Sequence, residues 1–384
     1  MKTKILFILL FAAFIISCSK SSNNNSEKTS LNNTKTEFAK TFPKYAKGFQ
    51  IKYFDNYKVL EVKNSWDTTK LAARYILVNK GSVKPSGEKG EVIEVPVKSM
   101  ACVFTTHIGY ALKLGVLDAI KGVCEPQYIK TSEMKKRVEA GKVINIGPST
   151  SVNIEKLISV EPDIVFVSPF KDNKYGKIQE LGIPLAVSAS YMENSPLARS
   201  EWIKFMAYFF NKEKEAEEIF DKIADNYNSL KAKTKNLKNK PTIFSNKRFG
   251  QVWFIPGGNS YMANFFKDAG ADYLWKKNQE TGSLALDYET VFDKAHNADF
   301  WSITANNGGN YSYRNLLGEY EAYKEFAAFQ NRKIILCNTH VKPYYETGLL
   351  EPDIILSDFI KVFHPELLPE YQPVYFDLMK QESR

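Results

Sequence analysis

Several segments place hydroxyl, imidazole and aromatic side chains directly after an apolar, strand-like run. The first comprises Thr105, Thr106 and His107, which follow residues 101–104. In open α/β sheets, ligands bind beyond the carboxyl ends of the strands, so we expect these side chains to line a cleft. The same rule selects further residues after later strands: Ser168, Phe170, Tyr191, Tyr261, Tyr311, Tyr313 and His340. Hydrogen-bonding groups and flat aromatic faces of this kind favour non-covalent binding of a ligand.

Little in the sequence indicates that the protein catalyses a reaction. The four histidines are too few and too scattered for the His-rich sites of zinc- or manganese-binding proteins. His107 and His340 could ligate iron, but helix capping or packing is the simpler explanation of each. The GxSxG elbow, the HExxH helix and the P-loop are all absent from the sequence. An enzyme is therefore an alternative function rather than the favoured one.

The first residues predict export and lipidation. Lys2 and Lys4 precede an apolar run over residues 5–16, which at about 1.5 Å per residue is too short to cross a membrane and is typical of a signal peptide. The run ends in Ile15-Ile16-Ser17-Cys18, which resembles the bacterial lipobox. We therefore expect a signal peptide over residues 1–17 and a lipid on Cys18. The alternative is an ordinary cleaved signal with a chance cysteine.

The polar stretch after Cys18 and the charge balance fit an exported globular protein. Residues 18–37 are rich in Ser, Asn, Thr and Lys, and we expect a flexible tether between the lipid and the folded part. The chain carries a formal charge of +9. Residues 231–248 contain seven lysines and arginines and no acidic residue. Such a run usually marks the solvated end of a helix, so we expect no nucleic-acid partner.

The remaining cysteines lie in apolar, strand-like surroundings. Cys102, Cys124 and Cys337 are therefore expected to be buried free thiols. A bridge between Cys102 and Cys124 is the alternative, if their strands are neighbours. No spacing among these cysteines resembles a zinc site, and we expect no directly bound metal.

The pattern of apolar residues predicts a two-lobed α/β protein. Residues 48–97 read as short alternating strands of a small antiparallel unit, and strands alternate with helices from residue 100 onward. A segment over residues 202–237 lacks Gly and Pro and has a helical apolar stripe, which predicts one long helix between two lobes. The expected domains are 38–200 for the β unit and first lobe, 201–238 for the helix, and 239–384 for the second lobe, each lobe having a parallel-rich, Rossmann-like sheet.

Three segments of the first half resemble one protein family. Residues 111–123 (ALKLGVLDAIKGV), 143–165 (with VINIG, NIEKL and EPDIV) and 180–184 (ELGIP) are similar, in order and spacing, to motifs of substrate-binding proteins. These proteins serve ABC importers of iron–siderophore complexes, haem and vitamin B12. The resemblance implies two α/β lobes joined by one long helix, with the ligand held in the cleft between them.

The resemblance also implies partners and site residues. The chain would be a monomer that captures a ferric siderophore, haem or cobalamin, needs no cofactor, and passes the ligand to an inner-membrane ABC permease from a lipid-anchored position in the periplasm or cell envelope. Glu155 and Glu289 match the positions that dock on permease arginines. The tyrosines of the predicted cleft would face the conjugated ligand, and Arg314 and Lys342 would offset a negative ferric complex. A surface scavenging or adhesion lipoprotein without a permease remains a second alternative.

Overall fold

The computed structural model describes residues 39–171 and 175–380, which all belong to one compact unit of residues 37–384. The predicted signal peptide, Cys18 and the predicted tether up to residue 37 lie outside the described residues. Within the described part of the chain, no helix is both long and apolar enough to cross a membrane.

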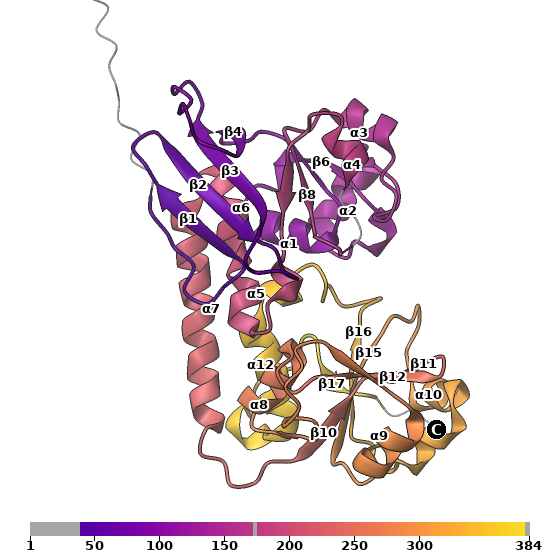
Figure 1. Cartoon of the computed structure of the whole chain (residues 1–384). Coiled ribbons are helices and arrows are strands. Elements are labelled where there is room, and N and C mark those ends of the chain that lie inside the picture. The colour runs from indigo at the N-terminus through magenta and orange to yellow at the C-terminus, as the bar shows by residue number, and fades with distance from the viewer. Residues whose placement is uncertain (1–38, 172–174, 381–384) are drawn as a thin grey trace, which may run out of the picture. The chain divides into compact units, whose positions relative to one another are not determined.

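A four-stranded sheet forms the first part of this unit (Figure 1). Its strands, in the order of the chain and of the sheet, are β1 (Phe49–Tyr53), β2 (Tyr57–Lys63), β3 (Leu71–Asn79) and β4 (Glu91–Val95). The first three pair in antiparallel fashion, as predicted, but β4 pairs parallel to β3. The difference arises because residues 80–90 carry the chain back to the middle of β3, where β4 starts opposite Tyr75.

The first lobe is a wholly parallel sheet with helices between successive strands. The sheet order is β7-β6-β5-β8-β9, and every pair is parallel. Its elements are β5 (Met100–Cys102), α1 (Thr105–Lys113), β6 (Ile120–Val123), α2 (Ser132–Glu139), β7 (Ile144–Asn145), α3 (Ile154–Val160), β8 (Ile164–Val167), α4 (Gly176–Gln179) and β9 (Leu185–Val187). The central strands β5 and β8 are fully buried, as expected of a parallel sheet covered on both faces.

The second lobe contains two sheets. The larger has the order β13-β10-β15-β16-β17 and is parallel except for β17, and the smaller has the antiparallel order β11-β12-β14. The strands are β10 (Thr242–Ser245), β11 (Arg248–Phe249), β12 (Val252–Pro256), β13 (Asp272–Tyr273), β14 (Ser283–Leu286), β15 (Phe300–Ala305), β16 (Ile334–Asn338) and β17 (Asp377–Leu378). The helices are α8 (Tyr261–Asp268), α9 (Tyr288–Ala295), α10 (Tyr313–Glu319), α11 (Ala327–Gln330) and α12 (Pro352–Phe363).

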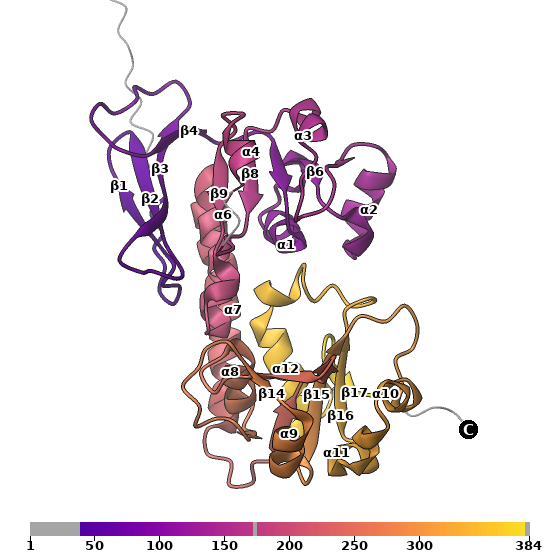
Figure 2. The same cartoon turned by 45° about the vertical axis from the view of Figure 1, so that its right-hand side comes forward.

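Three consecutive helices connect the lobes, where the sequence predicts one long helix. After α5 (Pro196–Ser200), α6 (Trp202–Phe210) ends at Asn211, whose φ of 52° is left-handed, and α7 (Glu213–Thr234) begins two residues later. Asparagine tolerates this conformation, and its side chain accepts a hydrogen bond from Lys58 Nζ at 2.9 Å. The prediction of one uninterrupted helix over residues 202–237 is therefore wrong, because the helix is broken at Asn211. In both views α7 runs alongside α6 and on to the second lobe, where it packs against α12 (Figures 1 and 2).

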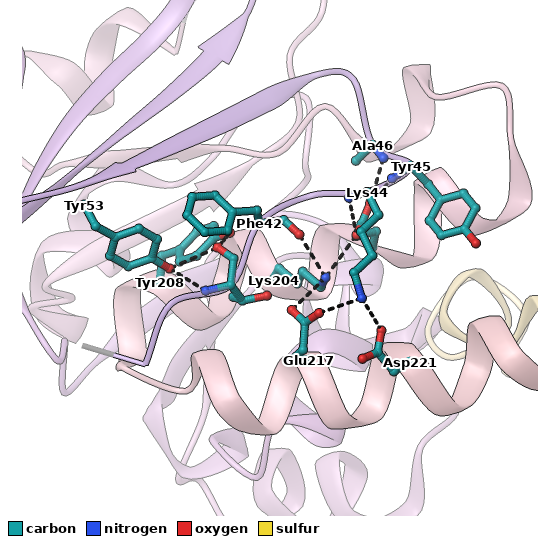
Figure 3. A network of polar contacts seen from close by, with 11 residues as sticks. Phe42, Lys44, Tyr45, Ala46, Tyr53, Lys204, Tyr208, Glu217 and Asp221 are labelled. Atoms are coloured by element: carbon teal, nitrogen blue, oxygen red, sulfur yellow. Dashed lines mark hydrogen bonds and ion pairs between the residues drawn. The ribbon is translucent and has the colours of Figure 1, made fainter. Parts of the chain in front are cut away.

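Residues 41–48, the strap, hold the N-terminal end of the unit against α6 and α7 (Figure 3). The fully buried Glu201 carboxylate accepts hydrogen bonds from the backbone N–H groups of Lys44, Tyr45 and Ala46 at 2.6–2.8 Å. Lys204, which is also fully buried, lies 3.1 Å from Glu201 and 2.9 Å from Glu217. Buried charges are tolerated when they are paired in this way. These contacts therefore give the strap a defined position against α6 and α7.

The apolar core includes two tryptophans and the three thiols that the sequence assigns to it. Trp253 and Trp301 are fully buried in the second lobe, with ring centroids 5.6 Å apart. Cys102, Cys124 and Cys337 are buried free thiols, as predicted. The alternative of a Cys102–Cys124 bridge is wrong, although β5 and β6 are neighbours in the sheet.

Candidate ligand-binding site

A first cavity, of about 270 Å³, lies between the two lobes. The first lobe contributes Phe104, Thr105, Cys124, Tyr128 and Lys130, and the second lobe contributes Asn306, Thr339, Lys342, Tyr345 and Glu346. Thr105 and Lys342 are therefore placed where the sequence predicts them. The Lys342 ammonium also donates a hydrogen bond to the Val374 carbonyl. Burial raises the pKa of the Cys124 thiol to about 12, so this group is neutral at physiological pH.

The loop after β16 closes one side of this cavity by direct contact between the lobes. The Thr106 hydroxyl donates to the Tyr345 carbonyl at 3.1 Å, and the buried Glu346 carboxylate accepts from the Thr131 N–H at 3.0 Å at the beginning of α2. A Cβ on Gly109 would lie 1.7 Å from the Glu346 carbonyl oxygen, so α1 and the loop approach each other here as only glycine allows. Thr106 thus joins the lobes rather than facing the cavity.

A second cavity, of about 470 Å³, shares Tyr345 with the first and also has walls from both lobes. The first lobe contributes Tyr191, Glu193 and Arg199, and the second contributes Ser245, Ser260, Tyr261 and Tyr344, among others. Tyr191 and Tyr261 are therefore placed where the sequence predicts them. The Arg199 guanidinium lies over the Tyr261 ring, 3.9 Å from its centroid.

Aromatic rings extend along the first-lobe wall between these cavities. The Phe170 ring, which is 45% exposed, lies 5.7 Å from Phe104 and 6.1 Å from Tyr191. The Tyr191 hydroxyl donates to the Pro169 carbonyl at 2.5 Å, which fixes this ring. Ser168 lies at the base of the same loop, where its carbonyl accepts from the Tyr175 hydroxyl at 2.8 Å. The resulting surface suits a flat, conjugated ligand.

His107 lies in the core of the first lobe and not in the cleft. Its side chain is 1% exposed, its Nδ1 has no hydrogen-bond partner among the described residues, and its ring lies 5.7 Å from that of Phe166. Burial lowers the pKa of His107 to about 3. The expectation that His107 lines the cleft is wrong, because the first turn of α1 directs it toward the sheet.

Besides Thr106, Ser168 and Phe170, four further predicted residues do not line either cavity as the structure describes them. Tyr311 is buried and donates to Glu319 at 2.7 Å, and Tyr313 is buried and accepts from the Ile334 N–H at 3.3 Å. Arg314 is exposed on α10, and His340 is exposed after β16. The loop over 304–314 folds back onto its own lobe, so its aromatic residues pack there instead of reaching the cleft.

Glu155 and Glu289 occupy equivalent positions on the two lobes. Each is exposed in the first turn of its helix, two residues after a side chain that caps the helix. Asn153 accepts from the Lys156 N–H at 2.9 Å, and Asp287 accepts from the Thr290 N–H at 2.7 Å. The two carboxylates are therefore presented to solvent in the same local geometry.

Three of the lining residues that lie outside the predicted set are Arg199 in the second cavity and Tyr128 and Glu346 in the first. Arg199 lies within α5, Tyr128 lies in a 3-10 turn, and Glu346 lies in a loop, whereas the selection rule considers only residues directly after strands. A charged residue within the apolar segment Pro196-Leu-Ala-Arg-Ser could have drawn attention to Arg199. Among the described residues, no group of three or more His, Cys, Asp or Glu side chains is placed to hold a metal ion.

Comparison with known proteins identifies the architecture. A family model described as "Periplasmic binding protein" matches residues 100–340. An uncharacterized lipoprotein of Methanocaldococcus jannaschii is 30% identical over 372 residues, which cover 89% of this chain and 87% of the relative.

Solved structures share the fold at low sequence identity. A periplasmic heme binding protein from Pseudomonas aeruginosa has a TM-score of 0.58 at 12% identity, covering 75% of this chain and 100% of that protein. A periplasmic binding protein from Veillonella parvula has a TM-score of 0.56 at 16% identity, covering 83% and 98%. The predicted family and the two-lobed α/β fold are confirmed, and the chain belongs to the periplasmic binding protein family.

Proposed function

We propose that this chain is the lipid-anchored substrate-binding protein of an ABC importer. It captures an iron complex (a siderophore complex or haem) or cobalamin between its lobes and delivers it to a permease. The observation that carries the proposal is the pair of neighbouring cavities with walls from both lobes, lined by aromatic rings and by the cations Arg199, Lys130 and Lys342. Aromatic faces hold conjugated ligands, and cations offset the charge of an anionic complex.

The two docking glutamates support delivery to a permease. Glu155 and Glu289 extend from capped helix ends of separate lobes, where an exposed carboxylate can pair with a partner's arginine. Both lie outside the lining of the two cavities between the lobes, so docking and ligand capture can use separate surfaces.

Anchoring through Cys18 is supported by the lipobox-like sequence and by relatives that are named lipoproteins. A lipid at Cys18 would keep the binding protein beside the membrane that contains the permease, which raises the effective concentration of the bound ligand there. The protein carries out no chemical step on its ligand under this proposal.

Titration of the purified full chain in detergent with a panel of ligands tests the proposal. The panel is hemin, a ferric tris-catecholate, a ferric trihydroxamate and cyanocobalamin, and the signal is quenching of tryptophan and tyrosine fluorescence. Saturable binding of at least one member with one-to-one stoichiometry is expected. If no member of the panel binds saturably, the proposed ligand class is wrong.

A further inference from the structure

The Arg199 guanidinium is held in place by two backbone carbonyl oxygens. Its Nε donates to the Glu193 carbonyl and its Nη2 to the Tyr191 carbonyl, both at 2.7 Å. No carboxylate oxygen of the described residues lies within 4.0 Å of its nitrogens. The two carbonyl acceptors fix the plane of the guanidinium, which faces the Glu193 carboxylate without forming an ion pair with it, and burial lowers the pKa of Arg199.

Tyr261, beside this cation, has an unused hydrogen-bond donor. Its side chain is 5% exposed, and its hydroxyl has no hydrogen-bond partner among the described residues. Burial raises the pKa of Tyr261, so the hydroxyl carries its proton at physiological pH. An unsatisfied buried hydroxyl is costly in a folded protein and therefore points to a missing acceptor.

Both groups line the second cavity, so one ligand atom could meet them together. The acid that faces Arg199 is Glu193, whose Oε1 accepts from the N–H groups of Lys47 and Gly48 at 2.8 Å and from the Trp202 indole at 3.2 Å. Glu193 is thus engaged by the strap and α6. The remaining polar residues of the wall that face this region, such as Ser245 and Ser260, are neutral.

We infer that Arg199 and Tyr261 form an oxyanion-binding subsite, which takes a carboxylate or catecholate oxygen of the captured ligand. An anionic oxygen would neutralise the guanidinium and accept the tyrosine O–H, which satisfies both groups with one contact. This inference rests on the proposed function and narrows it to ligands whose net negative charge lies on carboxylate or catecholate oxygens. Haem propionates and ferric tris-catecholates meet this requirement, whereas the ferric trihydroxamate and cyanocobalamin, whose phosphodiester charge is balanced within the molecule, are neutral overall.

The same panel of ligands, applied to matched variants, tests the subsite. For an anionic probe, either hemin or the ferric tris-catecholate, Arg199→Gln and Tyr261→Phe should each raise the dissociation constant about 10- to 100-fold, the range of a hydrogen bond to a charged group. For hemin and its dimethyl ester, the wild type should prefer the free acid, and both variants should lose that preference. A change in packing alone would weaken the acid and the ester equally.

A matched arginine–tyrosine pair outside the cleft provides the control. Arg248 lies over the Tyr320 ring at 4.0 Å, so Arg248→Gln removes the same kind of contact and should leave the affinities unchanged. The subsite is refuted if a probe binds equally well to wild type, Arg199→Gln and Tyr261→Phe, or if only cyanocobalamin or the neutral trihydroxamate binds. Binding of no probe refutes the proposed function itself, and this inference with it.

Discussion

Replacement of His107 by leucine separates the two roles that this residue could have. The structure buries the ring against Phe104 and Phe166 and leaves Nδ1 without a partner among the described residues. If His107 coordinated the iron of the captured complex, its ring would have to lie in the cleft. A core residue would instead make the folded state sensitive to acid, because a proton can bind the imidazole only after unfolding.

The size of this acid sensitivity follows from the shift in pKa. Burial lowers the pKa of His107 from 6.5 to about 3, so between these values the unfolded chain binds a proton that the folded chain does not. The folded state therefore loses stability as the pH falls below about 6.5. With 1.36 kcal/mol per unit of pKa, the loss between pH 7 and pH 5 is about 2 kcal/mol.

Urea unfolding of wild type and His107→Leu at pH 7 and pH 5 measures this difference. The wild type should lose about 2 kcal/mol more than the variant on acidification. His340→Leu, which removes an exposed imidazole, should lose as much as the wild type. Equal losses in wild type and His107→Leu would refute the core assignment. If the variant instead bound the ligand more weakly and its stability had the same pH dependence as that of the wild type, His107 would belong to the cleft.

Three further predictions concern docking, the strap and the contact between the lobes. Glu155→Gln with Glu289→Gln should abolish ligand uptake by cells while the affinity of the purified protein is unchanged, and reduced affinity would contradict the docking role. Glu201→Gln should lower the free energy of unfolding by about 3 kcal/mol, because it leaves Lys204 short of a buried partner, whereas the exposed Glu218→Gln should have little effect. Gly109→Ala should cost about 1–3 kcal/mol and weaken ligand binding by displacing the Glu346 loop, and an unchanged unfolding midpoint would contradict that close approach.

The parts of the fold that are determined locally could be predicted from the sequence. The helix over 352–363 has an apolar stripe and an initial proline, and α12 has these bounds. The apolar run over 163–168 predicts a buried parallel strand, and β8 is fully buried. The break at Asn211 could not be predicted in this way, because Lys58, 153 positions earlier in the chain, supplies the contact that stabilises it.

The candidate site was predictable only in part, because strand ends identify a region and not the direction of each side chain. Thr105, Tyr191, Tyr261 and Lys342 line the cavities between the lobes. His107, only two residues after Thr105, faces the core, and Tyr311 packs within its own lobe. Arg199 lies on a helix that no strand-end rule selects, and its two carbonyl acceptors and its place in the cavity wall are visible only in the folded structure.

The most direct test of ligand capture between the lobes is the anomalous scattering of iron in co-crystals of the full chain. The crystals would contain whichever ferric probe, hemin or the tris-catecholate, binds in the titration. One iron peak is expected in the cleft beside Tyr345, with an oxyanion of the ligand in contact with Arg199 and Tyr261. An iron peak on the outer surface of either lobe, or a ligand whose neutral face lies against Arg199, would contradict it.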